Sequence, residues 1–393
     1  MNKISTTLIS LTLALTLLSC APSLQPPPPV ATCPAGSAEA GRSSRSAEYQ
    51  QALDQIVKHG VPGVALAVYS PEGWFTGAAG LARIEDQTPM QNCHLQYLQS
   101  VAKTYMAVAI LQLHERGKID LDAPLTRYLP AAQAQAITNG STITIRMLLA
   151  HRSGIPEYNM QLAYITRLLQ HPDYIFDPVE YFQYIEGRPL DFEPGSRYAY
   201  CNTNYEILAL IADAITGDHA RFITENIFKP LELTNTYYRH EPGYMNYTGL
   251  VNTYWDRYSN GIVENATVLQ HNNVISLIGD DGIVATPADA VKFLRGLMEG
   301  KLLSASTMEL MKTWSDDKKG NPTYGLGLDY AKFNGVVALG HSGGGIGAGC
   351  QLYYFPEKEL YFFLGANLGT VTESPIHKAL ETDLSALHQI MLR

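Results

Sequence analysis

The chain has 393 residues, of which 46% are hydrophobic and 17% are charged. This length and composition are sufficient for a globular protein with a large buried core. The formal net charge is −9 and no stretch is rich in Lys or Arg. We therefore do not expect nucleic acid as a partner.

Residues 1–19 have the pattern of an export signal. Lys3 gives a basic start, and the apolar run Leu8–Leu18 is too short to span a bilayer. The segment ends in Leu17-Leu18-Ser19-Cys20, which resembles the lipobox of bacterial lipoproteins. That resemblance implies lipidation of Cys20, and thus a membrane as partner through an N-terminal lipid anchor. An ordinary secretory signal with an incidental cysteine is the alternative.

The lipobox implies a protein of the cell envelope, anchored on the periplasmic face of a membrane. Ala21 follows the cysteine, which favours the outer membrane. Residues 20–46 are rich in Pro, Ser, Ala and Gly, with consecutive prolines at Pro26–Pro29. Such a composition cannot bury a core and favours a semi-extended tether. The folded domain is therefore expected at 47–393.

Cys93, Cys201 and Cys350 are the cysteines of the folded part. They lie far apart in the sequence and form no Cys-x-x-Cys pair. This spacing indicates neither a zinc site nor a disulfide framework, and a single disulfide among the three stays open.

Helix and strand patterns follow one another along the folded part. In chain order we expect helix Ala47–His59, strands Val61–Ser70 and Trp74–Leu81, a long apolar helix that begins at Ser100, helices Ile143–Ala150, Pro178–Ile185, Tyr205–Thr216, Pro287–Met298 and Ser304–Trp314, strands Val336–Leu339, Gly349–Phe355 and Leu360–Leu364, and helix Ser374–Leu392. Between about 121 and 258 the pattern changes to short helices and loops. This order predicts an α+β fold, in which both chain ends form an antiparallel sheet flanked by helices and a mainly helical lobe is inserted at about 121–258.

The long apolar helix carries Ser100-Val101-Ala102-Lys103 at its start. Residues three apart share a helix face, so the Ser100 hydroxyl and the Lys103 amine can meet. The helix N-terminus supplies partial positive charge and free N–H groups near the hydroxyl. Because the helix is apolar nearly all round, we expect it to be buried, and burial shifts a lysine toward its neutral, proton-accepting form. The pattern predicts a serine nucleophile with a lysine as its base.

Two further motifs follow in chain order. Tyr200-Cys201-Asn202 lies just before an expected helix, and His341-Ser342-Gly343-Gly344 lies at a strand end. Ser-x-x-Lys, Tyr-x-Asn and His-x-Gly in this order resemble the serine β-lactamase-related family, which includes D,D-carboxypeptidases, D-aminopeptidases, esterases and class C β-lactamases. The segment Leu148–Pro156 resembles the family's LLxHxSGLP segment, and the resemblance covers about 47–392. It implies the β-lactamase/transpeptidase-like fold.

The resemblance also implies a role for each motif residue. Ser100 would attack a carbonyl carbon and become acylated while Lys103 accepts its proton. Tyr200 would pass that proton to the leaving group, and Asn202 would hold Lys103 and a substrate carbonyl. The residues implied for oxyanion and substrate binding are Asn202, His341, Gly343 and Gly344, together with the backbone N–H of Ser100. No metal or organic cofactor is implied.

The expected reaction is hydrolysis of an amide or ester bond through an acyl-enzyme on Ser100, with a small molecule or peptide as substrate. A D-amino-acid derivative or a cell-wall peptide is expected. Class C β-lactamases usually have Lys-Thr-Gly where this chain has His341-Ser342-Gly343. A histidine is only partly cationic near neutral pH and is therefore a weaker anchor for a substrate carboxylate. We expect a peptidase, amidase or esterase, and an efficient class C-type β-lactamase stays as the alternative.

Two interpretations from other classes remain. Gly340–Gly344 matches the Gly-x-Ser-x-Gly elbow of α/β-hydrolases, but a glycine-rich segment and a strand follow it where that fold needs a helix. The other is a non-catalytic envelope lipoprotein that keeps the fold for binding, and the presence of every motif residue argues against it. Cys201 is interpreted as a packed small residue, and His151 as a structural one.

Overall fold

The computed structural model describes residues 43–239 and 243–393. The export signal, Cys20 and nearly all of the tether lie outside these residues, so the expectations for them stay predictions. Within the described part of the chain, no helix is both long enough and apolar enough to cross a bilayer.

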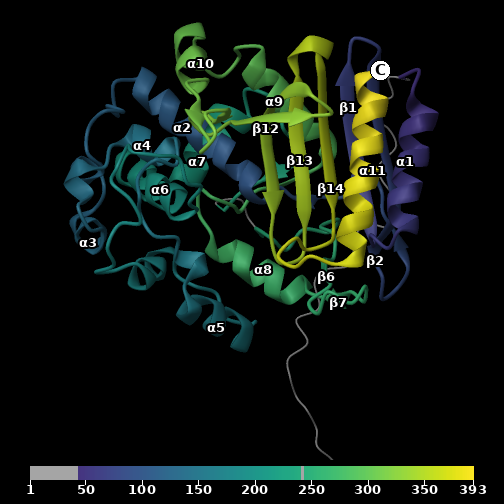
Figure 1. The fold of residues 1–393 in the computed structure, drawn as a ribbon, viewed down its shortest axis with the longest axis horizontal. Coiled ribbons are helices and arrows are strands. Elements are labelled where there is room, and N and C mark those ends of the chain that lie inside the picture. Colours follow the sequence, from purple (N-terminus) through teal and green to yellow (C-terminus); the bar gives the residue numbers. More distant parts are fainter. Residues whose placement is uncertain (1–42, 240–242) are drawn as a thin grey trace, which may run out of the picture.

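A nine-stranded sheet forms the centre of the fold (Figure 1), with the strand order β3-β2-β1-β14-β13-β12-β11-β10-β9. Its strands are β1 (Gly63–Ser70), β2 (Gly73–Arg83), β3 (Thr88–Pro89), β9 (Ser315–Asp316), β10 (Pro322–Tyr324), β11 (Asp329–Phe333), β12 (Val336–Gly344), β13 (Gly349–Phe355) and β14 (Leu360–Ala366). The N-terminal hairpin β1–β2 lies beside the C-terminal strand β14, where Val64 is paired with Ala366 in antiparallel register. Both chain ends therefore build one antiparallel sheet, which confirms the predicted α+β fold.

The terminal helices cover one face of this sheet. α1 (Ser46–Lys58) and α11 (Pro375–Leu392) contact each other and lie side by side in Figure 1. Leu53 and Leu387 from these helices belong to one hydrophobic cluster with Val64 of β1. Successive residues of a strand point to opposite faces of the sheet, so the side chains of β1 next to Val64 in the sequence point to the other face.

α9 (Pro287–Met298) and α2 (Ala102–Glu115) form two layers behind the second face. α9 contacts β1, β13 and β14. The Tyr105 ring of α2 stacks on Phe293 of α9, with 3.4 Å between ring centroids. Every residue of α2 from Ala102 to Leu113 is buried, as the apolar sequence predicts. Lys103 is thereby drawn into the protein interior.

A mainly helical part lies beside the sheet, on the left in Figure 1. Its helices include α3 (Ala131–Ala136), α4 (Ile145–Leu149), α5 (Leu162–Gln170), a 3₁₀ helix Pro178–Tyr184, α6 (Thr203–Thr216) and α7 (His219–Ile223). α8 (Thr267–Ser276) and α10 (Ala305–Met311) follow later in the chain. Two small sheets complete the fold: β4 (Gln96–Tyr97), β8 (Val284–Ala285) and β5 (Thr236–Tyr237) form one, and β6 (Tyr254–Trp255) with β7 (Glu264–Asn265) forms the other.

Several local expectations differ from the structure. Strand β12 continues to Gly344 instead of ending at Leu339, because its main chain still pairs with β13, and this pairing needs no apolar side chain. The helix expected to reach Trp314 ends at Met311, since the chain must turn there to enter β9. The segment expected as helix Pro178–Ile185 is a 3₁₀ helix.

The cysteine expectation is corrected as well. Cys93 is disulfide-bonded, whereas Cys201 and Cys350 are buried free thiols. The disulfide is therefore not formed among these three residues.

Candidate active site

Ser100 lies on a tight turn between a strand and the buried helix α2. The strand β4 ends at Tyr97, a 3₁₀ helix covers Gln99–Val101, and α2 begins at Ala102. Gln99 adopts a left-handed backbone conformation with φ 49°. Such a conformation is unfavourable for a residue other than glycine and is found preferentially at active sites. The turn places Ser100 on the wall of a cavity.

Lys103 lies directly behind Ser100 and is completely buried. Its Nζ donates a hydrogen bond to Ser100 Oγ at 3.1 Å and another to the backbone carbonyl of Asp280 at 2.9 Å. Burial lowers the pKa of the Lys103 ammonium below its ordinary value of 10.5, and the nearby carboxylates of Asp280 and Asp281 oppose this shift. A lysine with a lowered pKa is more easily neutral and can then accept the hydroxyl proton of Ser100.

Two buried acids, Asp280 and Glu206, act on the Lys103 amine. The Asp280 carboxylate lies 4.0 Å from Lys103 Nζ. Burial raises the pKa of both Asp280 and Glu206, and a hydrogen bond between the two side chains raises the pKa of Glu206 further while it lowers that of Asp280. We therefore assign the shared proton to Glu206 and the negative charge to Asp280, which faces the lysine.

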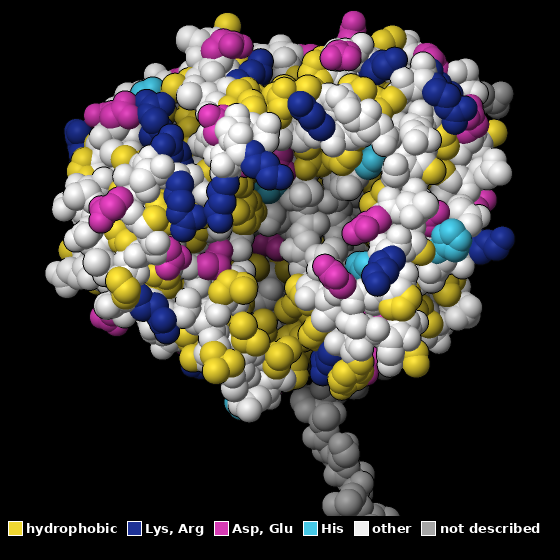
Figure 2. All heavy atoms as spheres, viewed as in Figure 1, with side chains coloured by type: hydrophobic (Ala, Val, Ile, Leu, Met, Phe, Trp, Pro, Cys, Tyr) yellow, Lys and Arg dark blue, Asp and Glu magenta, His cyan; other side chains and the backbone are white. Residues whose placement is uncertain are grey.

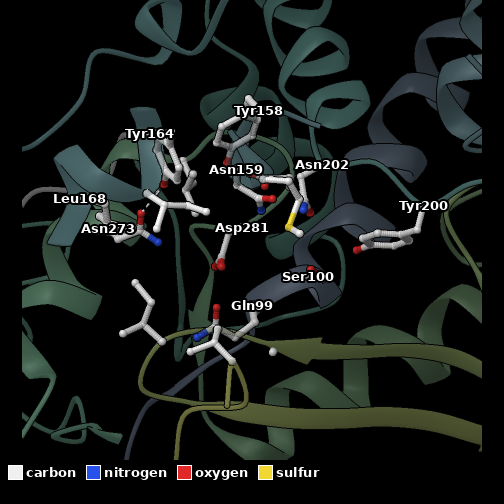
Figure 3. A pocket seen from close by; sticks show the side chains of 18 of the residues that line it. Gln99, Ser100, Tyr158, Asn159, Tyr164, Leu168, Tyr200, Asn202, Asn273 and Asp281 are labelled. Carbon is white, nitrogen blue, oxygen red and sulfur yellow. Dashed lines mark hydrogen bonds between the residues drawn. The ribbon is translucent and has the colours of Figure 1, made fainter. Parts of the chain in front are cut away.

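Tyr200 brings its hydroxyl to the nucleophile. The side chain is 38% exposed, but its hydroxyl end turns inward toward Ser100 (Figure 3). Burial of that end raises the pKa of Tyr200 well above its ordinary value, and a hydrogen bond with Ser100 only partly offsets this. Lys103 Nζ lies 5.2 Å from the centre of the Tyr200 ring. A phenol that keeps its proton is suited to donate it to a leaving group.

Asn202 lies near the nucleophile but is hydrogen-bonded to a different partner from the one expected. Its backbone N–H and its side-chain Nδ2 both donate to Glu157 Oε2, at 2.5 and 3.1 Å. Burial raises the pKa of Glu157, and the N–H of Asn202 opposes that shift. The described hydrogen bonds of the Asn202 amide group thus fix it to Glu157 rather than to Lys103.

His341 and the following glycines approach Ser100 along β12. His341 Nε2 lies 2.9 Å from the Tyr324 hydroxyl and Nδ1 lies 2.5 Å from the Ser342 carbonyl oxygen. Burial lowers the pKa of His341. A neutral ring that donates from Nδ1 and accepts at Nε2 satisfies both contacts. His341 is therefore a neutral hydrogen-bonding group near pH 7 rather than a cation.

Gly343 and Gly344 have different positions. Gly344 lines the cavity, whereas Gly343 lies behind the wall. A Cβ atom at Gly343 would lie 2.6 Å from the Leu98 carbonyl oxygen and 2.7 Å from Gln99 Cβ. Only a glycine permits this close approach of β12 to the turn that carries Ser100.

The cavity has a volume of about 790 Å³ and opens at the centre of the face shown in Figure 2. Of the site residues predicted from sequence, Ser100, Tyr200, Asn202, His341 and Gly344 line it. The rest of the wall combines the carboxyl groups of Asp280, Asp281 and Asp329 with a large apolar surface from the helical part. Figure 2 shows hydrophobic side chains gathered below the hollow.

Comparison with known proteins gives the family. The family model for Beta-lactamase matches residues 49–385, most of the described chain. The chain belongs to the Beta-lactamase family. Among curated members, penicillin-binding protein 4* of Bacillus subtilis is 27% identical over 338 residues, which are 82% of this chain and 72% of that protein. Protein flp of Staphylococcus aureus is 26% identical over 207 residues, 48% of this chain and only 38% of that protein.

Solved structures resemble this Beta-lactamase-family chain over nearly their whole length. A D-stereospecific amidohydrolase from Streptomyces sp. has a TM-score of 0.74 and 27% identity, covering 86% of this chain and 98% of that one. The D-amino acid amidase from Ochrobactrum anthropi SV3, complexed with L-phenylalanine amide, has a TM-score of 0.75 and 25% identity, covering 87% and 97%. These similarities confirm the β-lactamase/transpeptidase-like fold and support a hydrolase.

Sequence reasoning did not identify several residues of this site. These are Gln99, Glu157, Glu206, Asp280, Asp281 and Tyr324. One signal was visible: Gly279-Asp280-Asp281-Gly282 places two acids between glycines in an otherwise apolar stretch. Buried acids of this kind need a partner, and the partner Lys103 is 177 positions away in the sequence.

Proposed function

We propose that this protein is a serine hydrolase of the cell envelope that cleaves an amide or ester bond through an acyl-enzyme on Ser100. The observation that carries this proposal is the 3.1 Å contact between Ser100 Oγ and the buried Lys103 amine, on the wall of an open cavity. A nucleophile with a base of lowered pKa beside it is the arrangement that acyl transfer needs.

The chemistry follows from the positions of the groups. Neutral Lys103 takes the Ser100 proton while Oγ attacks the carbonyl carbon, and the backbone N–H groups of Ser100 and Gly344 are the expected oxyanion donors. Tyr200 protonates the leaving nitrogen or oxygen as its bond to carbon breaks, and is reprotonated from Lys103. Water then attacks the acyl-Ser100 ester, which releases the acid and restores the hydroxyl. One water is consumed for each amine or alcohol released.

The amide of a D-amino acid is the favoured substrate. Two of the similar solved structures are a D-stereospecific amidohydrolase and a D-amino acid amidase. Because a penicillin-binding protein is also among the similar proteins, a cell-wall peptide is the second candidate substrate. His341 is neutral and therefore offers a β-lactam carboxylate no fixed positive charge, so efficient class C-type β-lactamase activity is the weaker alternative.

The proposal is tested by steady-state hydrolysis of D-phenylalanine p-nitroanilide and of a p-nitrophenyl ester. Ser100→Ala is expected to lower kcat/KM for both by about a thousandfold or more, because no other group supplies the nucleophile. Ser306→Ala, on the exposed surface of α10, is the matched control and should match the wild type. Turnover that persists in Ser100→Ala contradicts the mechanism, and a protein inactive on every ester and amide supports the non-catalytic alternative.

A further inference from the structure

We infer that Asp281 binds the ammonium group of the substrate, so that this cavity selects amides or esters of amino acids with a free amino group over N-acylated or carboxylate-bearing ones. This inference rests on the proposed function in one respect, because it takes Ser100 as the reacting group. It adds a residue that decides specificity and the sign of charge that it recognises.

Asp281 is held inside the cavity with one oxygen unused. It lies in the loop between α8 and β8, is only 6% exposed and lines the cavity. One carboxyl oxygen accepts a hydrogen bond from the Gly282 N–H at 2.6 Å. Among the described residues no other hydrogen bond or ion pair is made by this carboxyl group. Figure 3 shows its carboxyl end pointing into the open space at the centre of the cavity.

No Lys, Arg or His among the described residues forms an ion pair with Asp281. The described ionisable groups whose charges act on it are Asp280, Lys103, Tyr97, Tyr244 and Cys350. Of these, only Lys103 can carry a positive charge, and its amine is already hydrogen-bonded to Ser100 Oγ and to the Asp280 carbonyl. Burial, and then the charge of Asp280, raise the pKa of Asp281 to about 7. A ligand ammonium would supply the missing partner, and charge-assisted hydrogen bonds are among the strongest that proteins make.

Gln99 is an independent sign that a polar ligand group belongs here. Its side chain is 1% exposed and lines the same cavity, yet its Nε2 finds no hydrogen-bond partner among residues 43–239 and 243–393. In Figure 3 the Gln99 amide points into the space below Asp281. A buried amide without a partner is unfavourable, and this one is held there by the left-handed backbone next to Ser100. An amide both donates and accepts, so it can pair with the amino or carbonyl group of a bound amino-acid derivative.

The charge of the whole cavity agrees with a cationic ligand. Asp280, Asp281 and Asp329 line it, and no Lys or Arg is among the described residues of its wall. In the described part of the chain, no three His, Cys, Asp or Glu residues are grouped so that they would hold a metal ion. A substrate carboxylate would meet like charges here, whereas an ammonium would be attracted. The acids therefore favour an organic cation.

The apolar lining indicates what the substrate carries besides its amino group. Tyr164, Leu168, Trp255, Leu277 and Ile346 line the cavity, and so do the exposed residues Met160, Leu169 and Val371. An aromatic or aliphatic side chain would bury its surface against such a lining. Phenylalanine derivatives are therefore suitable probes.

The test compares D-phenylalanine p-nitroanilide, whose amino group is free, with its N-acetyl derivative on the full chain. We expect kcat/KM to be at least about tenfold higher for the free amine, the range of one charge-assisted contact. Asp281→Asn should remove most of this preference by raising KM for the free amine. The ratio of kcat/KM between the free amine and its N-acetyl derivative is taken within the same variant, so any effect of the change on the reactivity of Ser100 cancels. Asp281→Glu should keep part of the preference, and the control Asp54→Asn on the exposed side of α1 should keep all of it.

The outcomes separate this inference from the proposed function. Ser100-dependent hydrolysis of p-nitrophenyl acetate, with no preference for the free amine or an unchanged preference in Asp281→Asn, overturns the inference alone. Hydrolysis that does not depend on Ser100 overturns both. If Asp281→Asn does not fold, a competition experiment with the wild type tests the inference. D-phenylalaninol should protect Ser100 from a fluorophosphonate at about tenfold lower concentration than N-acetyl-D-phenylalaninol does. Equal protection by the two compounds overturns the inference.

Discussion

The residues around Lys103 provide the surroundings that the proposed role of this lysine as a base needs. The sequence predicts that Lys103 meets Ser100, because residues three apart share a helix face. It does not predict Asp280 or Glu206, since those acids are brought to Lys103 from distant parts of the chain. The role of Tyr200 could be inferred only from its motif, because its approach to Ser100 is a tertiary contact.

The lowered pKa of Lys103 sets the direction of the pH dependence. In the proposed mechanism the neutral form of Lys103 is the active one, and this form is populated as pH rises through a pKa below the ordinary value of 10.5. The acylation rate with a neutral p-nitrophenyl ester should therefore increase with rising pH over the range in which the protein stays folded. Stopped-flow measurement of p-nitrophenol release gives this acylation rate. A rate that falls over this range would show that a charged Lys103 is the active form.

Tyr200→Phe should affect substrates according to their leaving groups. Removal of the hydroxyl should slow amide hydrolysis by about 10²-fold or more, because the amine must be protonated as it leaves. Hydrolysis of a p-nitrophenyl ester should change much less, since p-nitrophenolate leaves without a proton. Tyr258→Phe, at an exposed tyrosine, is the control. Equal losses for amide and ester would argue that Tyr200 only shapes the site.

At the level of elements, the site forms where β12 meets the turn before α2. The apolar pattern predicted the flanking elements, including the hairpin β1–β2, α1, α9 and α11. The same pattern predicted the end of β12 too early, at Leu339. A glycine-rich strand that is held by main-chain pairing has no alternation of hydrophobic side chains that would reveal it. The short helix α5, which contributes the apolar cavity wall, was not expected either.

Gly343→Ala tests the close approach of β12 to the turn. The added Cβ would lie 2.6 Å from the Leu98 carbonyl oxygen, so strand and turn must move apart. We expect a loss of about 1–3 kcal/mol in the free energy of unfolding, as for other overpacked sites, together with reduced ester hydrolysis. Urea unfolding and the ester assay measure the two effects. Gly140→Ala is the control, since its nearest contact would be 3.3 Å to a side-chain methyl; equal effects of the two changes would contradict the account of Gly343.

For the whole molecule, both chain ends join in one sheet (Figure 1), and residues of this sheet and of the helical part line the cavity. The sequence could predict this arrangement because hairpin and strand patterns occur at both ends and short helices lie between them. It could not predict the cavity's chemistry, which combines residues from α5, the Asp280–Asp281 loop and β12. The lipid anchor at Cys20 is proposed from the lipobox alone.

Cys20→Ser tests the anchor. The lipid is attached through the cysteine thiol, so serine at this position should release the protein from membranes into the soluble envelope fraction. Fractionation with immunodetection measures this, and a Ser37→Ala variant in the expected tether is the control. Undiminished membrane retention of Cys20→Ser would show that another segment holds the protein there.

The assignment of Ser100 as the nucleophile is tested most directly by labelling the full chain with a fluorophosphonate and measuring its intact mass. We expect the mass of one probe per chain, located on Ser100 by peptide mapping, and no adduct in Ser100→Ala. Labelling should also fall strongly in Lys103→Ala, which removes the base. An adduct on another residue, or undiminished labelling of Ser100→Ala, would contradict the assignment of Ser100 as the nucleophile.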